Sequence, residues 1–205
     1  MPAPEPDVLL VDLGGVLFHY DFHRAINRWA TLANVNATLL RERFAIDGPF
    51  DAFERGTIAP GEYLAHLRRL LGVDLDDHAL TAGWNAIYGP AHHDLVALLR
   101  RLDPQRIVPV GVSNTNILHA ASWRRRYRQQ LTALRAVYCS HEIGHTKPDR
   151  AFFTHITSSL GADLDRLIVL DDQPAVITAA TAMGLRAHLH RTATGTADFL
   201  ATLGH

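Results

Sequence analysis

The sequence predicts an α/β fold: a Rossmann-like parallel sheet core with a small all-helical cap inserted after the first strand. Two patterns support this prediction. From residue 91 onward, helical patterns alternate with short apolar runs, which is typical of the right-handed βαβ units of a parallel sheet. Between about residues 21 and 87, only helical patterns follow the first apolar strand at residues 8–12. We therefore expect a core of residues 1–17 and 91–205 and a cap of residues 18–90.

The individual elements are bounded by Gly, Pro and Asp residues, which interrupt the apolar periodicity. The strands expected after the first one cover residues 107–113, 136–139, 167–170 and 185–189. The helices expected in the cap cover residues 22–33, 37–45, 60–71 and 76–88. The helices expected in the core cover residues 92–102, 117–134, 148–160, 174–183 and 196–203.

The composition argues against several classes of protein. Hydrophobic residues make up 47% of the 205 residues, which is enough for a packed core. The formal net charge of −1 gives no drive toward nucleic acid or an acidic membrane, and the basic run at residues 123–130 is more typical of a solvated helix face. The chain shows neither the start of a secretory signal nor an apolar stretch of membrane-spanning length. We expect a cytoplasmic protein whose single cysteine, Cys139, is buried.

Polar side chains stand where three of the expected strands end. Asp12 ends the first strand, Ser113 ends the second, and the pair Asp171-Asp172 ends a later one. In an open α/β sheet the carboxyl ends of parallel strands converge on the crevice where ligands bind. A nucleophilic carboxylate, a hydroxyl and two acids brought together there favour metal-assisted phosphoryl chemistry.

Four segments resemble the ordered motifs of the haloacid dehalogenase-like (HAD) superfamily. They are VLLVDLGGVLF, PVGVSNTN, HEIGHTKPDRAFF and LIVLDDQPA, and the helical block between the first two is similar to the C1-type cap of that superfamily. Within the block, YDFHRAINRW, FERGTIAPGEYLAHL and GWNAIYGP resemble the bacterial phosphatases that include α-glucose-1-phosphate phosphatases. The resemblance covers nearly the whole chain. Each motif alone is weak, whereas four in order on the expected element types are specific.

The resemblance implies that Asp12 is a nucleophile that forms an aspartyl-phosphate. The alternative is an aspartate that caps the turn before Gly14-Gly15. Gly14 departs from the family pattern, which usually has a second Asp here as general acid and base. Its backbone carbonyl can still bind a metal, but the lost acid–base help is worth ~10²–10⁴-fold in rate. His19 and His23 are the candidates to replace it, because histidine titrates near neutrality.

The resemblance also implies a phosphate-binding group formed by Ser113, Asn114 and Lys147. Ser113 and neighbouring backbone amides would hold phosphate oxygens, and the Lys147 ammonium would offset charge on the aspartyl-phosphate. The alternatives are a helix cap formed by the Ser-Asn-Thr-Asn segment and a solvated lysine in a polar loop.

A cation is expected beside the adjacent acids Asp171 and Asp172, because packing both next to Asp12 without one costs repulsion and desolvation. Mg²⁺ would take oxygens from Asp12, the Gly14 carbonyl and Asp172, with Asp171 binding through water or orienting its neighbours. A helix cap at Asp172 is the alternative. Val176 stands where the family commonly has Asp or Asn, which leaves open what anchors Lys147.

Three residues of the expected cap, Asp21, Arg24 and Glu54, could contact a leaving group as cap residues of the family do. Surface salt pairing is the favoured interpretation for each of them.

The favoured function is a Mg²⁺-dependent phosphatase that acts on a small phosphorylated metabolite. Since Gly14 cannot protonate the departing oxygen, we expect leaving groups that need little help, such as those of sugar 1-phosphates, and slow hydrolysis of the phospho-enzyme. Two alternatives are a metal-independent 2-haloacid dehalogenase, and a catalytically weak or inactive domain that binds a phosphometabolite or a protein partner.

Overall fold

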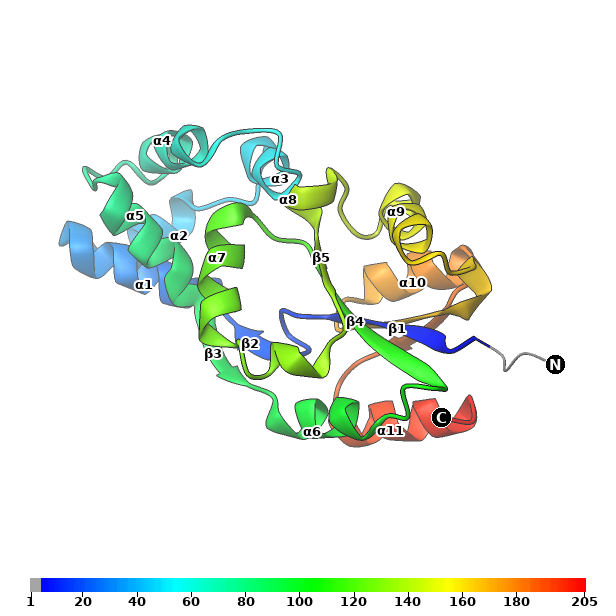
Figure 1. Cartoon of the computed structure of the whole chain (residues 1–205). Coiled ribbons are helices and arrows are strands. Elements are labelled where there is room, and N and C mark those ends of the chain that lie inside the picture. Colours follow the sequence, from blue (N-terminus) through cyan, green and yellow to red (C-terminus); the bar gives the residue numbers. More distant parts are fainter. Residues whose placement is uncertain (1–4) are drawn as a thin grey trace.

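The protein, described at residues 5–205 by a computed structural model, has a five-stranded parallel sheet at its centre (Figure 1). The strand order is β5-β4-β1-β6-β7, with every neighbouring pair parallel. The strands are β1 (Asp7–Asp12), β4 (Ile107–Ser113), β5 (Val137–Cys139), β6 (Leu167–Asp171) and β7 (Arg186–Leu189). The predicted α/β fold class is confirmed.

Helices cover both faces of this sheet, so the strands carry apolar residues on both sides. On β1, Leu9 and Val11 join the core cluster on one face, while Val8 and Leu10 join the cluster on the other. This alternation follows from the period of two along a strand. The first face is covered by α6 (His93–Arg101) and α11 (Ala193–Thr202), and the second by α9 (Arg150–Leu160) and α10 (Pro174–Ala182) (Figure 1).

Five helices lie between the strands β1 and β4, where the sequence predicted an all-helical block of four. They are α1 (Phe22–Ala33), α2 (Ala37–Arg43), α3 (Gly48–Glu54), α4 (Pro60–Leu71) and α5 (Asp77–Trp84). Their shared interior is aromatic: the rings of Trp29 and Trp84 stack with centroids 6.1 Å apart, and Trp29 Nε1 donates to the Leu80 carbonyl. A methyl group at Gly83 would come within 2.0 Å of Trp29 Nε1, so this close packing requires glycine. Helix α3 was not predicted, because its 7 residues, about two turns, give too short a periodic signal.

A two-stranded antiparallel sheet, also not predicted, joins the helical segment to the core. It pairs β2 (Phe18–Tyr20) with β3 (Tyr88–Ala91), so the chain leaves and re-enters the core side by side. Short strands such as these carry almost no pattern of their own. Their pairing depends on residues about 70 positions apart.

The helix predicted over residues 117–134 is also corrected. Helix α7 (Ile117–Arg126) ends at Tyr127, and a 3₁₀ turn (Leu131–Ala133) follows. The Tyr127 ring stacks on Phe18 with centroids 4.2 Å apart, and its hydroxyl donates to the Gly89 carbonyl. These contacts to the β2–β3 pair end the helix at Tyr127, although the local sequence contains no signal for a helix end there.

Two other sequence expectations concern burial and the basic run. Cys139 is fully buried, as predicted.

In the basic run at residues 123–130, Arg124 pairs with Glu142 and Arg126 donates to the Gly89 carbonyl, so part of the positive charge of the run is engaged by neighbouring groups. Among residues 5–205, no helix has the length and apolar character needed to cross a bilayer.

Trp84 connects the helical segment to the core, because its ring stacks on His119 of α7 at 4.5 Å and its Nε1 donates to Asn116 Oδ1. We expect Trp84→Ala to lower the free energy of unfolding by about 3–5 kcal/mol, measured by urea denaturation. Arg28→Ala, an exposed substitution on α1, is the control and should change it by less than about 0.5 kcal/mol. Equal effects of the two substitutions would contradict this packing role.

Candidate functional site

The ends of β1 and β6 bring together the acids that the sequence singled out. Lys147, in the loop before α9, places its ammonium nitrogen 2.6 Å from Asp12 Oδ1 and 2.6 Å from Asp171 Oδ2. All three side chains are buried. The alternative of a solvated loop lysine is therefore wrong.

The site carries more negative than positive charge. Oxygens of Asp12, Asp171 and Asp172 lie within 4.8 Å of one another, with one ammonium between two of them. Burial raises the pKa of Asp12 to about 7, against the attraction of Lys147. Burial, followed by repulsion from Asp171, also raises the pKa of Asp172. Although burial favours the neutral form of Lys147, the charges of Asp12 and Asp171 outweigh it and raise the lysine pKa.

The donor atoms at this site fit a small divalent cation. Asp172 Oδ1 is buried without a hydrogen-bond partner, a state that costs free energy unless a ligand satisfies it. Asp171 has no such vacancy: Oδ2 accepts from Lys147 and Oδ1 accepts from the Gln173 amide. The carboxylates with oxygens available to a cation are thus those of Asp12 and Asp172, and oxygen donors suit Mg²⁺. The two hydrogen bonds to Asp171 favour the orienting role over binding through water, the two alternatives that the sequence leaves for this residue.

Two glycines after Asp12 allow close approach of other groups. Gly15 has φ +83, and a methyl group on it would lie 2.2 Å from Asp172 Oδ2. Gly14 is covered by the ring of Tyr20, since a methyl group there would lie 3.1 Å from Tyr20 Cδ1. The aromatic ring from β2 therefore fills the space that an acidic side chain at position 14 would need.

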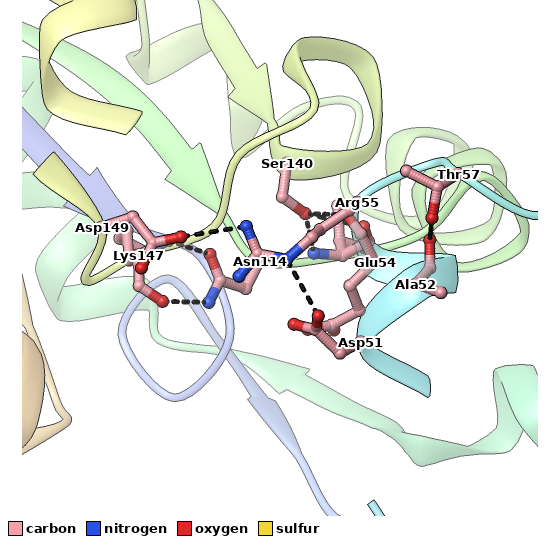
Figure 2. A network of polar contacts seen from close by, with 10 residues as sticks. Asp51, Ala52, Glu54, Arg55, Thr57, Asn114, Ser140, Lys147 and Asp149 are labelled. Carbon is pink, nitrogen blue, oxygen red and sulfur yellow. Dashed lines mark hydrogen bonds and ion pairs between the residues drawn. The ribbon is translucent and has the colours of Figure 1, made fainter. Parts of the chain in front are cut away.

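The side chain of Asn114 binds the backbone of Lys147. Its side-chain amide donates to the Lys147 carbonyl and accepts from the Lys147 backbone N–H, both at 2.8 Å (Figure 2). These two bonds hold the Asn114 side chain against the loop that carries Lys147. Ser113 is buried and faces the same cavity as Asp12. The cap of α7 is Asn116, whose side chain accepts from the His119 amide, so Ser113 is not needed as a cap.

Val176 does not leave Lys147 without an anchor. Val176 is 3% exposed and belongs to the apolar cluster under α9 and α10. Lys147 is held instead by the carboxylates of Asp12 and Asp171 and by Asn114. The departure from the family pattern is thus offset by neighbouring groups.

A cavity of about 240 Å³ opens above Asp12. Its polar side includes Asp12, Gly14, Ser113, Asn114 and Lys147. Much of the remaining lining is apolar or aromatic: Phe18, Tyr20, Phe22, Ile46, Phe50, Ile87, Tyr88 and Trp123. Glu54, from the end of α3, also lines this cavity.

The three residues expected to form surface salt pairs do not do so within residues 5–205. Asp21 accepts from the His23 amide as the N-cap of α1, and Arg24 donates to the Ala86 carbonyl. Glu54 faces the cavity, where burial, followed by repulsion from Asp51, raises its pKa to about 7. The sequence contains little indication of a catalytic role for Glu54, because nothing in the FERG segment shows that this side chain lies near the strand ends of the core.

His19 and His23 lie elsewhere. Both are exposed and line a second hollow next to Asp172, not the cavity that contains Asp12 and Lys147. The structure thus weakens the hypothesis that either histidine replaces the missing acid.

Comparison with known proteins shows a fold that agrees with this geometry. A HAD-family enzyme of Bacteroides thetaiotaomicron, BT-2542, crystallised with magnesium and inorganic phosphate, is 26% identical with a TM-score of 0.77, covering 91% of this chain and 95% of that one. A predicted HAD-like family hydrolase of Porphyromonas gingivalis has a TM-score of 0.74 and 21% identity, covering 90% and 91%. The sesquiterpene phosphatase astK of Aspergillus oryzae is 25% identical over 197 residues, 94% of this chain and 91% of that protein. No protein-family model matches the chain.

We expect Mg²⁺ to raise the melting temperature, because a ligand that binds only the folded state stabilises it by about 2.7 kcal/mol at about 100 times Kd. Asp172→Asn should remove most of this shift, since it removes the charge beside the unpartnered oxygen. Thermal unfolding with Mg²⁺ and with EDTA measures the effect. Asp163→Asn, an exposed substitution outside the site, should keep the full shift. A shift that survives Asp172→Asn would contradict the cation assignment.

The raised pKa of Glu54 predicts a pH dependence of stability. The folded protein holds this proton up to about pH 7, while the unfolded chain loses it near 4.5. The contribution of Glu54 is fully present below the unfolded value and is lost as pH rises through about 7. Glu54→Gln should therefore lose less unfolding free energy than the wild type over this window, in urea titrations with EDTA. Glu62→Gln, on an exposed part of α4, should follow the wild type, and identical slopes for all three proteins would refute the prediction.

Proposed function

We propose that this protein, which has the fold of HAD-family hydrolases, is a Mg²⁺-dependent phosphatase that acts on a small phosphorylated metabolite through an aspartyl-phosphate on Asp12. One observation carries the proposal. Two buried carboxylates, Asp12 and Asp171, share the ammonium of Lys147 at the base of a cavity, and the half-buried Asp172 beside them has an oxygen without a partner. This is the charge distribution that a divalent cation and a phosphate group would complete together. The magnesium and phosphate in the BT-2542 crystal support the same interpretation.

Each residue of the site has a role in this reaction. Asp12 attacks phosphorus and its oxygen displaces the leaving group. Lys147 stays charged between Asp12 and Asp171 and offsets negative charge on the transferring group. Ser113 and the backbone amides that follow it hold phosphate oxygens. When bound, Mg²⁺ would be held by Asp12, Asp172 and the Gly14 carbonyl, with Asp171 as orienting acid, and would neutralise charge on the phosphate.

The division of labour between the two parts of the chain is also a proposal. Residues 1–17 and 91–205 would act as the catalytic core, and residues 18–90 as a C1-type cap that selects the substrate. Phe22, Phe50 and Glu54 of the helical segment line the cavity opposite core residues Ser113 and Lys147, which supports this division.

Two substrate classes fit the cavity. Sugar 1-phosphates remain a candidate, because their leaving groups need little proton transfer and the sequence resembles α-glucose-1-phosphate phosphatases. The aromatic lining by Phe22, Phe50 and Tyr88 favours phosphate esters with an apolar part. The similarity to a sesquiterpene phosphatase adds weight to the apolar class.

The alternative functions make different demands on the same residues. A 2-haloacid dehalogenase works without metal and would leave Asp12, Asp171 and Asp172 crowded with one ammonium. A domain that only binds phosphometabolites would account for Gly14, but it requires neither a nucleophile nor the buried ion pair behind it. The charge excess therefore favours the phosphatase.

A panel of phosphate monoesters containing a sugar 1-phosphate and a prenyl phosphate tests the proposal. We expect phosphate release with Mg²⁺ and none with EDTA. Asp12→Asn should lower turnover on the order of 10³-fold or more, since it removes the nucleophile and keeps the size of the side chain. Hydrolysis that is insensitive to EDTA would contradict the metal-dependent mechanism. Binding of phosphate esters without any turnover would instead identify a binding domain.

A further inference from the structure

We propose that Glu54 of α3 supplies the general acid and base that position 14 lacks. This inference rests on the proposed phosphatase function. It assigns to a residue of the helical segment a proton-transfer role that the HAD-like pattern places two residues after the nucleophile.

The first argument is the place of Glu54 in the cavity. Among the residues that line it, Asp12 and Glu54 carry the carboxyl groups. Asp12 is bound to Lys147, whereas the Glu54 carboxyl makes no hydrogen bond or ion pair within residues 5–205. It is thus available to a group that enters the cavity.

The other titratable groups of the cavity are poor proton donors or acceptors. His119 is buried, its Nε2 contacts the Trp84 carbonyl at 3.0 Å, and its ring stacks on Trp84. Burial lowers its pKa to about 3, so it is neutral and held in place. Burial, followed by repulsion from Asp172, raises the pKa of Tyr20 to about 12, which makes it a weak acid near neutral pH. Neither group can exchange a proton in both directions at pH 7.

The second argument is that Glu54 is fixed relative to the core. Its carbonyl oxygen lies 2.6 Å from Ser140 Oγ, and the next residue, Arg55, donates to Asp51 and to Asp149, each at 2.9 Å (Figure 2). Asp149 stands two residues after Lys147, so this ion pair ties the end of α3 to the loop that carries the ammonium.

Backbone packing adds to this anchoring. Gly56 has φ +68, and a methyl group on it would lie 2.2 Å from the His141 carbonyl oxygen. The end of α3 is therefore in direct contact with the backbone of α8 (Ser140–Ile143). A catalytic group needs a position fixed to within fractions of an ångström, and a helix end held by these contacts can provide it.

The third argument is electrostatic. Burial is the main cause that raises the pKa of Glu54 to about 7; Asp51 and Asp12 add to it, and Lys147 and Arg55 oppose it. The other titratable groups that it influences are the phenols Tyr20, Tyr63 and Tyr88, which are neutral at this pH. A group with a pKa near the working pH can give a proton in one step and take one in the next.

The proton balance is then complete. In the first step an Asp12 oxygen forms a bond to phosphorus, the bond from phosphorus to the leaving oxygen breaks, and the Glu54 proton passes to that oxygen to form an alcohol. In the second step water attacks phosphorus while the Glu54 carboxylate takes one of its protons. The bond from Asp12 to phosphorus breaks, inorganic phosphate leaves, and Asp12 and Glu54 return to their starting states.

The ring of Tyr20 gives a reason why the acid comes from another element. It occupies the space beside Gly14, so a carboxylate there would have to displace an aromatic side chain. The slow phospho-enzyme hydrolysis expected from Gly14 alone would accordingly be absent in the wild type and would appear when Glu54 is neutralised.

The test compares the wild type with Glu54→Gln, Glu54→Asp and the exposed control Glu62→Gln on an alkyl phosphate and on p-nitrophenyl phosphate. We expect Glu54→Gln to lower kcat for the alkyl ester by ~10²–10⁴-fold with little change in KM, and to remove the limb of the pH–rate profile near pH 7. With p-nitrophenyl phosphate, whose leaving group needs no proton, rapid-quench analysis of Glu54→Gln should show a burst and an accumulated phospho-enzyme that the wild type lacks. Glu54→Asp should recover part of the rate and the pH dependence, and Glu62→Gln should match the wild type.

A readout that does not depend on turnover completes the design. The rise in melting temperature caused by Mg²⁺ should be unchanged in Glu54→Gln, because Glu54 is not among the proposed cation ligands. Loss of this rise would make Glu54 a cation ligand and overturn its acid–base role. A folded Glu54→Gln variant with the kcat and pH profile of the wild type would also overturn the acid–base role. If Asp12→Asn were inactive in the same experiment, the proposed phosphatase function would still stand. Absence of Mg²⁺-dependent turnover in the wild type would overturn both.

Discussion

The buried ion pairs of Lys147 are the constraint on which the rest of the site depends. One ammonium contacts carboxylates from two neighbouring strands, at 2.6 Å each, with all three groups out of solvent. Removing either partner of such a pair leaves an uncompensated buried charge, a change that typically costs about 3–5 kcal/mol. The reciprocal bonds of Asn114 fix the backbone of the same lysine. The loop before α9 is thereby held to β1, β4 and β6.

The ion pairs alone leave the site with excess negative charge, and this excess favours the binding of a cation. Asp172 adds a third carboxylate with a buried, unpartnered oxygen, and its approach to Gly15 is possible only because that residue has no side chain. Burial raises the pKa of both Asp12 and Asp172, because negative charge on either carboxylate is costly in this desolvated site. The same desolvation makes the binding of a divalent ion favourable and strengthens its field on a bound phosphate.

The helical segment contributes more than a cover to this site. Tyr20 fills the space beside Gly14, while the contacts of Arg55 and Gly56 press the end of α3 against the core. An acid supplied from α3 would make proton transfer depend on closure of the helical segment over the sheet. Substrate selection and catalysis would then share residues, since this segment supplies Phe22, Phe50 and Glu54 to the lining of the cavity above Asp12.

The sequence by itself determined the parallel sheet and the strand-end acids, because the carboxyl ends of parallel strands must converge and apolar periodicity is local. The helices at residues 22–33 and 60–71 were predicted with their observed bounds for the same reason. Only the tertiary structure decided the β2–β3 pair, the end of α7 at Tyr127 and the approach of Glu54 to the cavity, while His19 and His23 proved to lie outside it. Each of these depends on contacts between residues far apart in the chain, and such contacts leave no periodic or spacing signal in the sequence.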